Sequence, residues 1–545
     1  MSTLDWVILI TTLCGIIMYG IYKSRTTKNL DGYFLSNRSM PWYMVLLSIM
    51  GTQASAVTFL SAPGQAYTDG MRFVQYYFGL PIAMIVICIF FVPVFRRLKV
   101  YTAYEFLENR FDGKTRSLTS GLFLLSRGLS TGISIYAPSI ILSSLLGWNI
   151  YYTNLVMGGL LIIYTMSGGA KAVAYTQQLQ LIIIIAGMFL AGYMVVTLLP
   201  EGMDFKSAIK VAGNHGKMNV ITSGVTNGHF DWKDKYNIWS GVIGGFFLAL
   251  SYFGADQSQV GRYLTAKSQK ESKIGLLTNG LVKVPMQFLI LLVGILVFSF
   301  YQYHKAPVYF DNATVLLAKN TEYKDSLISL EQKYSSTLAA NDYERSNVIR
   351  AQYKAVLKKA LPGQDPNDTN FIFLRFVVDN LPKGLVGLLI AVIFLAAWGS
   401  IAAALNSLAS CTVVDFHKKY INVGCTEKED YNISRWYTLG WGVFSIIVAM
   451  FAHNLGNSLI EAVNILGSLF YGVILGIFLV AFWIKRIKAN AVFYASVVGE
   501  LLVILIYKLD YISFLWLNVI GALLVIILSF VIQLFLPVDR KPVVS

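Results

Sequence analysis

Long apolar runs separated by short polar stretches form the main pattern of this chain. A helix that crosses a bilayer needs about 20 mostly apolar residues. Runs of this kind predict spanning helices near residues 4–22, 42–63, 74–95, 117–146, 150–166, 174–199, 237–255, 275–302, 383–413, 434–453, 457–482, 489–507 and 511–536. We therefore expect an all-α membrane protein with about 13 transmembrane helices.

The composition supports the same class. Hydrophobic residues make up 56% of the chain, charged residues only 13%, and the mean hydropathy is +0.59. These values are typical of an integral membrane protein. The formal charge of +15 fits basic cytoplasmic loops, so we expect no nucleic-acid partner. The four cysteines show no metal-like spacing, and we expect neither a zinc site nor a disulfide framework.

The distribution of basic residues predicts the orientation. Met1–Asp5 contains no basic residue, whereas Lys23, Arg25 and Lys28 follow the first apolar run. Basic residues recur in alternate loops, at 96–116, 262–273, 418–435, 485–488 and 540–541. Because cytoplasmic loops are enriched in Lys and Arg, the pattern predicts a multi-pass protein of the cell membrane. Its N-terminus is expected outside, its C-terminus in the cytoplasm, and its first helix uncleaved.

The stretch from Pro41 to Gly64 is long enough to span the membrane but is interrupted at Gly51-Thr52-Gln53-Ala54-Ser55. Unwound backbone at mid-membrane depth is tolerated where it lines a wet cavity or holds an ion. The stretch therefore predicts a transport site. The alternative is a face of small residues that packs closely against a neighbouring helix.

A hydrophilic insert at 304–383 is far longer than a connection requires. Apolar residues recur in it at helical spacing, at Tyr323, Leu327, Leu330, Tyr334 and Leu338, and again at Ile349, Tyr353, Val356 and Ala360. The pattern predicts an external helical hairpin. It would serve as a structural cap or as a surface for a protein partner.

Charged residues inside membrane spans are costly and therefore informative. Four fall inside the predicted spans, at Arg127, Lys283, Glu461 and Glu500. Arg127 and Lys283 should need partners or a wet cavity, whereas Glu500 fits a helix-packing role. Two aspartates lie near inner helix ends, where Asp256 is expected to pair with Arg262, and Asp415 with Lys418.

Several motifs resemble those of the solute:sodium symporter family. The segment YTMSGGAKAVAYTQQLQ at 164–180 is similar to the family's Gly-Gly loop and following helix start. Other matches are GYFLSNRSMPW at 32–42, GRYLTAKSQKES at 261–272 and ALNSLASCTVVDFHKKY at 404–420. The phrases IYAPSIIL and LSYFGADQSQVGRYL look closest to the iodide, multivitamin and monocarboxylate branch.

The resemblance implies a LeuT-type core of two inverted five-helix repeats, with one helix before the core and two after it. The implied parts are a peripheral helix and inner loop at 1–41, the first repeat at 42–199, an outer loop at 200–236, the second repeat at 237–482 and two C-terminal helices with a tail at 483–545. Substrate and ion then bind at mid-membrane, where the first helix of each repeat is broken. The second break is expected around Tyr252-Phe253-Gly254.

The resemblance also implies a sodium site. It falls on the carbonyls of Gly51, Ala54 and Ala396 and the side chain of Ser400. Gly399 stands where the family usually has a second hydroxyl, and Gln177 where it has an aspartate on the sodium exit path. Sodium is a hard cation that prefers oxygen ligands, and carbonyls with hydroxyls supply them.

Candidate substrate residues follow from the same comparison and from the residue types. They are Gln53, Thr58, Tyr76, Tyr77, Tyr252, Phe253, Lys283 and Val463. The aromatic rings and one lysine would suit a ring that carries a carboxylate, although core packing would also explain the rings. Of the sugar-pocket positions of the galactose-transporting relative, only the lysine at Lys283 is kept.

These observations favour a sodium-coupled symporter of a small carboxylate, vitamin, sugar or polyol that works by alternating access. A sodium-independent uniporter and a proton-coupled transporter are the alternatives within the same class. A membrane sensor would need a signalling domain, yet only Pro537 to Ser545 follow the last predicted helix. A membrane enzyme would need a reactive constellation, and the sequence shows none that converges, so we do not expect an enzyme.

Overall fold

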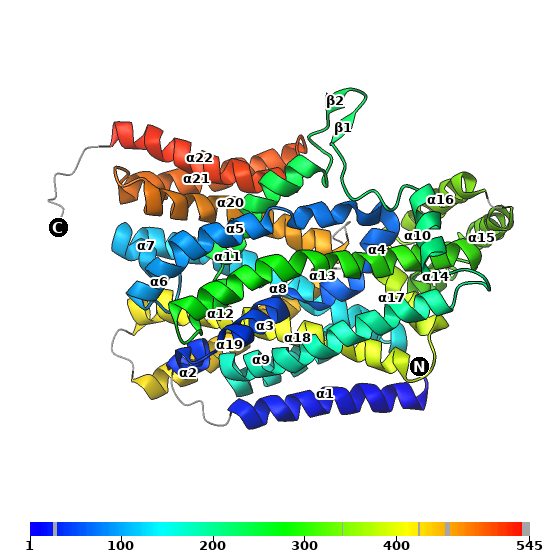
Figure 1. Ribbon diagram of the computed structural model, residues 1–545, viewed down its shortest axis with the longest axis horizontal. Helices are drawn as coiled ribbons and strands as arrows, with labels where there is room; N and C mark the ends of the chain where they lie inside the picture. The colour runs from blue at the N-terminus through cyan, green and yellow to red at the C-terminus, as the bar shows by residue number, and fades with distance from the viewer. Residues whose placement is uncertain (25–29, 341, 364, 423–425, 453–457, 537–545) are drawn as a thin grey trace.

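The computed structural model is almost entirely helical (Figure 1). It describes residues 1–24, 30–340, 342–363, 365–422, 426–452 and 458–536. Arg25 and Lys28, which helped to predict the orientation, lie outside the described residues, as does the basic pair at 540–541. The predicted all-α membrane class is confirmed.

The elements of the helix bundle follow each other in the order α1 (Thr3–Ser24), α3 (Trp42–Gln53), α4 (Ala56–Asp69), α5 (Leu80–Val86), α6 (Val92–Leu98), α8 (Gly113–Leu146), α9 (Ile150–Thr197), α11 (Gly245–Gly254), α12 (Gln257–Leu264), α13 (Gln269–Tyr303), α18 (Leu385–Cys411), α19 (Glu427–Phe451), α20 (Leu459–Trp483), α21 (Ala489–Leu509) and α22 (Phe514–Phe535). Tighter or wider helical turns connect some of them, at Ser36–Arg38, Gly70–Tyr77, Ile87–Phe91, Ser240–Gly244 and Thr412–Ile421. The remaining elements are α2 (Leu30–Leu35), α7 (Glu105–Arg110), α10 (Phe205–Asn214), α14 (Asn312–Ala318), α15 (Lys324–Ala339), α16 (Tyr343–Ala360), α17 (Thr369–Asn380) and the two-stranded hairpin of β1 (Val225–Thr226) and β2 (His229–Phe230).

Within the described ranges, nine helices are long and apolar enough to cross a membrane. Two shorter apolar helices accompany them, at Ile150–Met166 and Ser240–Gly254. The multi-pass architecture is therefore clear, whereas the expected count of 13 spanning helices stays a prediction.

The predicted interruption of the first core helix is confirmed. Helix α3 ends at Gln53 and α4 begins at Ala56, and the two residues between them leave the helical region, Ala54 with ψ 68° and Ser55 with ψ 166°. In a continuous helix the Ser55 N–H would bond to the carbonyl of Gly51 and the Thr58 N–H to that of Ala54. Here they donate instead to Gln53 and Ser55, each at 2.9 Å. The break thus takes the regular partner away from the carbonyls of Gly51 and Ala54.

The second break lies slightly later than we expected. Helix α11 continues through Tyr252 and Phe253 to Gly254, and the chain leaves helical geometry at Ala255 and Asp256. The Asp256 carboxylate accepts a 2.7 Å hydrogen bond from the Ser258 N–H and so caps α12. Because a capping carboxylate stabilises a helix start, the new helix begins after Asp256 rather than at the glycine.

Helix α9 holds two of the predicted spans, those at 150–166 and 174–199. The hydroxyls of Tyr164 and Thr176 are 2.5 Å apart. In a straight helix, residues 12 positions apart would be separated by about 18 Å along the axis, which two side chains cannot bridge. The chain therefore turns back on itself between these residues, where the YTMSGGAKAVAYTQQLQ motif lies.

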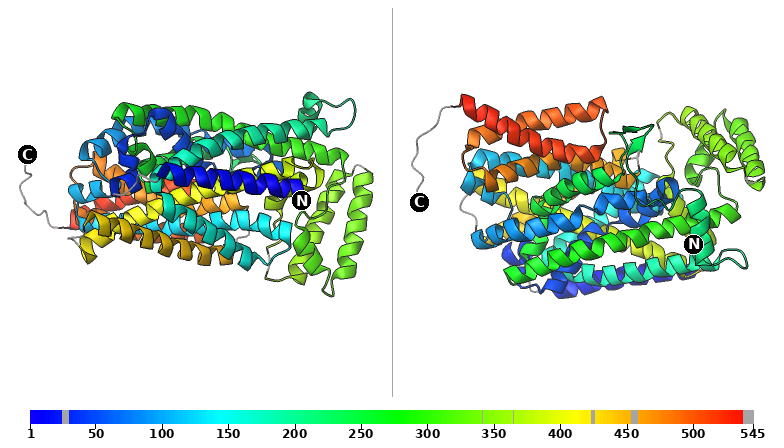
Figure 2. Two further views of the ribbon diagram at one scale, coloured as in Figure 1. Left: turned by 90° about the horizontal axis from the view of Figure 1, so that it is seen from below. Right: turned by 45° about the horizontal axis from the view of Figure 1, so that its top comes forward.

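Figures 1 and 2 show the helices aligned along the long axis, with α14 to α16 at one end, near the N-terminus. The C-terminal end of α22 lies at the opposite end (Figure 1). We call the end with α14 to α16 the insert side. The predicted helical hairpin of the insert is confirmed as α15 and α16, whose apolar faces meet at Leu327, Tyr334 and Tyr353.

One buried carboxylate joins the two ends of the insert to each other. Asp368 is 1% exposed and forms ion pairs with Arg350 at 2.9 Å and Lys354 at 2.6 Å. It also accepts a 2.9 Å hydrogen bond from the Phe310 N–H. Although burial favours a higher pKa for Asp368, the two cations outweigh it and lower the pKa below the ordinary value.

Candidate functional site

The two helix breaks flank a central cavity of about 150 Å³. This is about ten times the volume that one water molecule requires, so the cavity has room for a small organic solute. It is lined by residues from α3, α4, the turn at Gly70–Tyr77, α5, α8, α11, α13, α18 and α20. All eight predicted substrate residues line it, namely Gln53, Thr58, Tyr76, Tyr77, Tyr252, Phe253, Lys283 and Val463. The structure brings them together, while their role in binding stays a prediction.

Lys283 is the cation of the cavity that lacks a partner. Its side chain is 2% exposed, and no hydrogen bond or ion pair to it occurs among the described residues. Its Nζ lies 5.6 Å from the ring centroid of Tyr77, which gives a cation–π contact. A buried ammonium with no carboxylate beside it is costly. An anion bound in the cavity would offset that cost.

Arg127, by contrast, has a carboxylate partner. Its guanidinium forms an ion pair with Asp256 and donates a 3.1 Å hydrogen bond to the Tyr471 hydroxyl, which itself donates to Asp256 at 2.7 Å. It also lies over the Tyr252 ring at 5.4 Å. This set of four residues, which we call the Arg127 latch, joins α8, α11 and α20 at one wall of the cavity. The predicted Asp256–Arg262 pair is wrong, because Asp256 lies at the helix break and faces α8.

The predicted partner of Asp415 is also wrong. Asp415 forms an ion pair with Arg116 at 2.6 Å and accepts hydrogen bonds from Thr102 and Ser120, each at 2.8 Å. Lys418 pairs with Asp430 instead, at 2.8 Å. Both aspartates are bound to residues distant in the sequence, which a local pattern does not reveal.

Several cavity residues were not predicted from the sequence. Asn464 accepts a 3.0 Å hydrogen bond from the Tyr76 hydroxyl, and its amide nitrogen has no partner among the described residues. Ser130 and Ser134 line the cavity from α8. Ser130 lies three positions and Ser134 seven positions after Arg127, so they share one helix face with it, and that spacing is the signal that would have found them.

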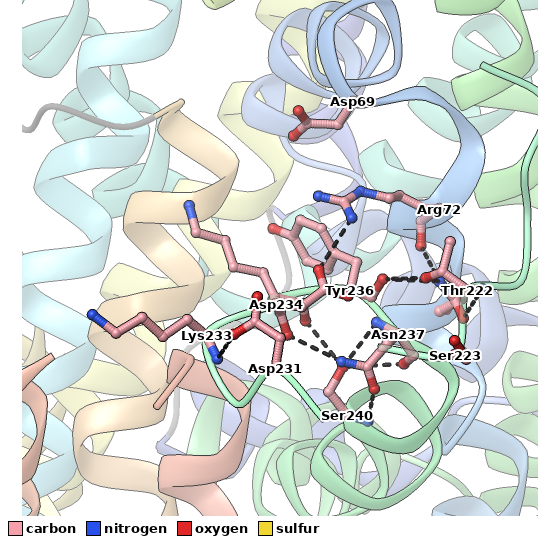
Figure 3. Close-up of polar contacts among 12 residues, drawn as sticks. Asp69, Arg72, Thr222, Ser223, Asp231, Lys233, Asp234, Tyr236, Asn237 and Ser240 are labelled. Carbon is pink, nitrogen blue, oxygen red and sulfur yellow. Dashed lines mark hydrogen bonds and ion pairs between the residues drawn. The ribbon is translucent and has the colours of Figure 1, made fainter. Parts of the chain in front are cut away.

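On the insert side, polar contacts hold the loop after α10 against the turn at Gly70–Tyr77 (Figure 3). Arg72 forms an ion pair with Asp234 at 3.1 Å. Glu461, at the start of α20, accepts hydrogen bonds from the Tyr236 hydroxyl at 3.0 Å and from Lys235 at 3.1 Å. We call Glu461, Tyr236 and Lys235 the Glu461 latch. Glu500 takes no part in either latch, and neither of its carboxylate oxygens has a hydrogen-bond partner in the described part of the chain.

The predicted sodium residues lie on two neighbouring helices, Gly51 and Ala54 at the end of α3, and Ala396, Gly399 and Ser400 on α18. The carbonyls of Gly51 and Ala54 are the ones whose regular helical partners the break removes. Ser400 lines the cavity, and its hydroxyl donates to the Ala396 carbonyl at 3.0 Å. The atoms that would bind the ion are neutral oxygens, which a hard cation prefers as ligands. The chemistry of these residues therefore suits a sodium ion, while their role in binding it stays a prediction.

Gln177 lies between the two helices. Its Nε2 donates to the Gly399 carbonyl at 2.9 Å and to the Thr52 hydroxyl at 3.2 Å, while its Oε1 accepts from Ser48 at 2.9 Å. A Cβ added to Gly51 would lie only 2.9 Å from the Cβ of Gln177. An amide thus links α3 and α18 where the resemblance led us to expect a carboxylate.

Comparisons with known proteins give a family and a shared fold that agree with this geometry. The model of the sodium:solute symporter family matches residues 33–336 and 348–499. A sodium/sialic acid symporter of Proteus mirabilis is 25% identical over 96% of this chain and 93% of its own. A sodium-dependent multivitamin transporter of Oryctolagus cuniculus is 28% identical over 88% and 66%. A solved structure of a Na⁺-coupled sialic acid symporter in a substrate-bound outward-open state has a TM-score of 0.78 at 24% identity, over 98% of each chain, and so shares the fold.

Proposed function

Because the chain belongs to the sodium:solute symporter family, we propose that its central cavity carries a small organic anion across the membrane together with sodium. The chain is a multi-pass membrane protein and a sodium-coupled symporter of a small solute. The anionic nature of the solute, the residues that bind it and the path it takes are our proposal.

The observation that carries the proposal is the unpaired Lys283. A carboxylate bound to its ammonium would form a charge-assisted hydrogen bond in a site of low dielectric. The hydroxyls of Ser130 and Ser134 and the free amide nitrogen of Asn464 offer hydrogen bonds to a polar body. The rings of Tyr76 and Tyr252 offer flat apolar contact. A hydroxylated carboxylic acid fits this set better than a neutral polyol, which would leave the lysine unpaired.

Sodium would bind between α3 and α18. The carbonyls of Gly51, Ala54 and Ala396 and the Ser400 hydroxyl would hold it, and the ion would supply a positive charge that joins the broken helix to α18. Ser400 also lines the solute cavity. Binding of the ion would therefore order the α3–α4 break that forms one wall of the solute site, which couples the two ligands.

The two latches suit alternating access. The Glu461 latch lies on the insert side, and the Arg127 latch joins helices at another wall of the cavity. We propose that the repeats at 42–199 and 237–482 rock against each other, so that only one latch opens at a time. Binding of sodium and the solute shifts the population of conformations toward the one that holds both of them.

We further propose that the protein resides in the cell membrane with its N-terminus and insert outside and its C-terminus in the cytoplasm. The basic loops predicted inside support this orientation. The helical hairpin of the insert would then face the exterior, where it serves as a cap and offers a surface to protein partners.

Reconstitution into proteoliposomes tests the function. An inward sodium gradient should drive accumulation of a labelled hydroxy acid above its external concentration, and choline should not replace sodium. The panel should include sialic acid, because two of the similar relatives are sodium/sialic acid symporters, together with monocarboxylates, vitamins, neutral sugars and polyols. Equilibration without accumulation would indicate a uniporter, and accumulation driven only by a pH gradient would indicate proton coupling. No uptake of any solute would favour a sensor.

A further inference from the structure

A second cavity opens between α9 and α13, away from the central one. It measures about 460 Å³ and is lined almost wholly by apolar side chains. Its floor is buried, with Phe59 1%, Val293 6% and Met286 9% exposed. Its rim is open, with Phe189 62% and Tyr193 66% exposed. We call it the α9/α13 groove.

The groove opens onto the membrane-facing surface. Both helices that form it belong to the apolar spans, at Ala172–Thr197 and Gln269–Tyr303. Its exposed rim is aromatic and aliphatic, and a surface of this kind within a spanning helix is in contact with hydrocarbon rather than water. An apolar ligand from the bilayer can therefore enter the groove from the side.

The length of the groove matches one leaflet. The lining residues run from Ile185 to Val196 along α9 and from Met286 to Leu296 along α13. At a rise of 1.5 Å per residue these stretches measure about 15 to 17 Å. The hydrocarbon core of a bilayer is about 30 Å thick, so one leaflet contributes about 15 Å. A single acyl chain of one leaflet would fill the groove from end to end.

Positive charge lies at the insert-side end of the groove. Helix α10 contributes Phe205 to the lining, and α10 is fixed to α13 by a 2.7 Å hydrogen bond from the Ser299 hydroxyl to the Ala208 carbonyl. Lys206 and Lys210 are exposed on α10, four residues apart and so on one face. The nearby Asp204 caps α10 by accepting a 2.8 Å hydrogen bond from the Ser207 N–H, and its negative charge offsets part of the positive charge of Lys206. The two ammonium groups are placed to attract a phosphate.

We propose that the α9/α13 groove binds one acyl chain of an anionic phospholipid from the insert-side leaflet, with Lys206 and Lys210 at its phosphate. The groove shares a wall with the central cavity. Phe59 in its floor follows Thr58, which lines the central cavity, and Met286 lies one turn beyond Lys283. The bound chain therefore packs against the outer half of the broken helix and supports the wall of the solute site.

Lipid photocrosslinking on the purified full-length protein tests this proposal. The probe is phosphatidylglycerol with a photoactivatable diazirine in one acyl chain, incorporated into phosphatidylcholine nanodiscs. Mass spectrometry should locate adducts on Phe189, Tyr193 or Leu289. Crosslinking should exceed that of the matched phosphatidylcholine probe, and the double substitution Lys206→Gln/Lys210→Gln should remove this preference.

Two glycines on α9 provide a matched pair of variants. Gly192 lines the groove, and an added Cβ would lie 3.5 Å from Val293, an ordinary contact. Gly159 has no atom within 4 Å of an added Cβ and does not line the groove. The change Gly192→Leu should displace about two methylenes of the acyl chain and lower crosslinking on the order of tenfold, because each buried methylene contributes to the free energy of binding. The change Gly159→Leu should leave it unchanged.

A second pair keeps the test informative if Gly192→Leu does not reach the membrane. Leu289→Gln places an unpaired amide at the groove rim, and Leu281→Gln places one at an exposed position of the same helix outside the groove. Only Leu289→Gln should reduce crosslinking. Equal groove adducts in the parent and in both groove variants would overturn the assignment of the occupant. Equal crosslinking by the two headgroups in the parent would overturn the role of the lysines. Neither outcome depends on which solute the protein carries.

Discussion

The side-chain amide of Gln177 donates a 2.9 Å hydrogen bond to the backbone carbonyl of Gly399. This bond crosses from α9 to α18, and the same nitrogen reaches Thr52 on α3. A neutral amide thus holds together two helices between which sodium is proposed to bind. The amide leaves the site without a fixed negative charge, so the strength of sodium binding depends on the oxygens of the backbone and of Ser400.

Replacing Gln177 with Asp should increase the dependence of stability on sodium. The carboxylate would lose both N–H donors and face carbonyl oxygens, a repulsion that a bound cation relieves. A ligand that binds only the folded state raises the apparent unfolding temperature. The rise in that temperature on adding sodium chloride instead of choline chloride should therefore be larger in Gln177→Asp than in the parent. The uncharged control Gln177→Asn should show no such increase, and an equal rise in all three proteins would contradict the placement of the ion.

Restoring a hydroxyl at Gly399 should strengthen sodium binding. The Cβ of Gly399→Ser would lie 2.5 Å from Oε1 of Gln180. The Nε2 of Gln180 has no hydrogen-bond partner among the described residues, so this flexible side chain is free to rotate away. One added oxygen ligand is worth about 1 kcal/mol, or several-fold in the sodium concentration that gives half-maximal uptake. Gly440→Ser, at an open position on α19, is the control.

Removing the hydroxyl of Ser400 should have the opposite effect. Ser400→Ala deletes the one side-chain ligand of the proposed site and should raise the sodium concentration for half-maximal uptake several-fold, for a lost contact of about 1 kcal/mol. Ser407→Ala is a matched control on the same helix, because its hydroxyl also donates to a backbone carbonyl, at 2.9 Å, and does not line the cavity. Uptake by the parent that is independent of sodium would contradict the site whatever the variants show.

Neutralising Lys283 should distinguish anionic from neutral solutes. Lys283→Gln removes a charge-assisted hydrogen bond worth about 1.5 to 3 kcal/mol, which corresponds to a loss of about tenfold or more in affinity for a carboxylate. A neutral analogue of the same solute should lose much less. Binding is measured by thermal shift and by uptake, with Lys270→Gln, exposed near the start of the same helix, as the control. Unchanged affinity for every bound solute, at normal expression, would place the solute elsewhere.

The insert should loosen in acid because of Asp368. Its pKa is lower in the folded state than in the unfolded chain, so the folded insert binds this proton more weakly. The contribution of Asp368 is therefore complete above its ordinary pKa of 3.8 and is lost as the pH falls below it through the lower folded value. Hydrogen-exchange protection of α16, corrected for intrinsic rates, should be constant from about pH 5 to 7 and fall below about pH 4. Asp368→Asn should remove this fall, whereas Asp325→Asn, exposed on α15, should retain it.

The orientation is tested by cysteine labelling. Ser335 is exposed on the insert and Asn490 is exposed at the start of α21. In a background whose four native cysteines are replaced by serine, Ser335→Cys should react with an impermeant maleimide on intact cells. Asn490→Cys should react only after permeabilisation. The reverse pattern would mean that the positive-inside analysis had inverted the protein.

The helix break near Ala54 was predictable because its sequence signal is local, with Gly, Ser and Ala interrupting an apolar run. The eight predicted solute residues came from the family resemblance and from their residue types, and they meet in one cavity. The long-range pairs were not predictable. The partners of Asp256 and Asp415 come from α8, more than 100 positions away in the sequence, and they replace the nearby lysine or arginine that a local pattern favours. Gln177 was expected on the sodium path, but its bonds to Thr52 and Gly399 depend on how three helices pack.

The closed base of the insert makes it a replaceable module. The Phe310 N–H and the Asp368 carboxylate are 2.9 Å apart, so the chain leaves and re-enters the membrane domain at nearly one point. Elements between these residues pack mainly on one another, through their own apolar cluster. Lengthening, shortening or exchanging α14 to α16 leaves that point unchanged, provided the new segment supplies a cation for Asp368. The insert-side surface of this transporter can therefore diverge, or be engineered to carry a tag or binding domain, without altering the helices that line the central cavity.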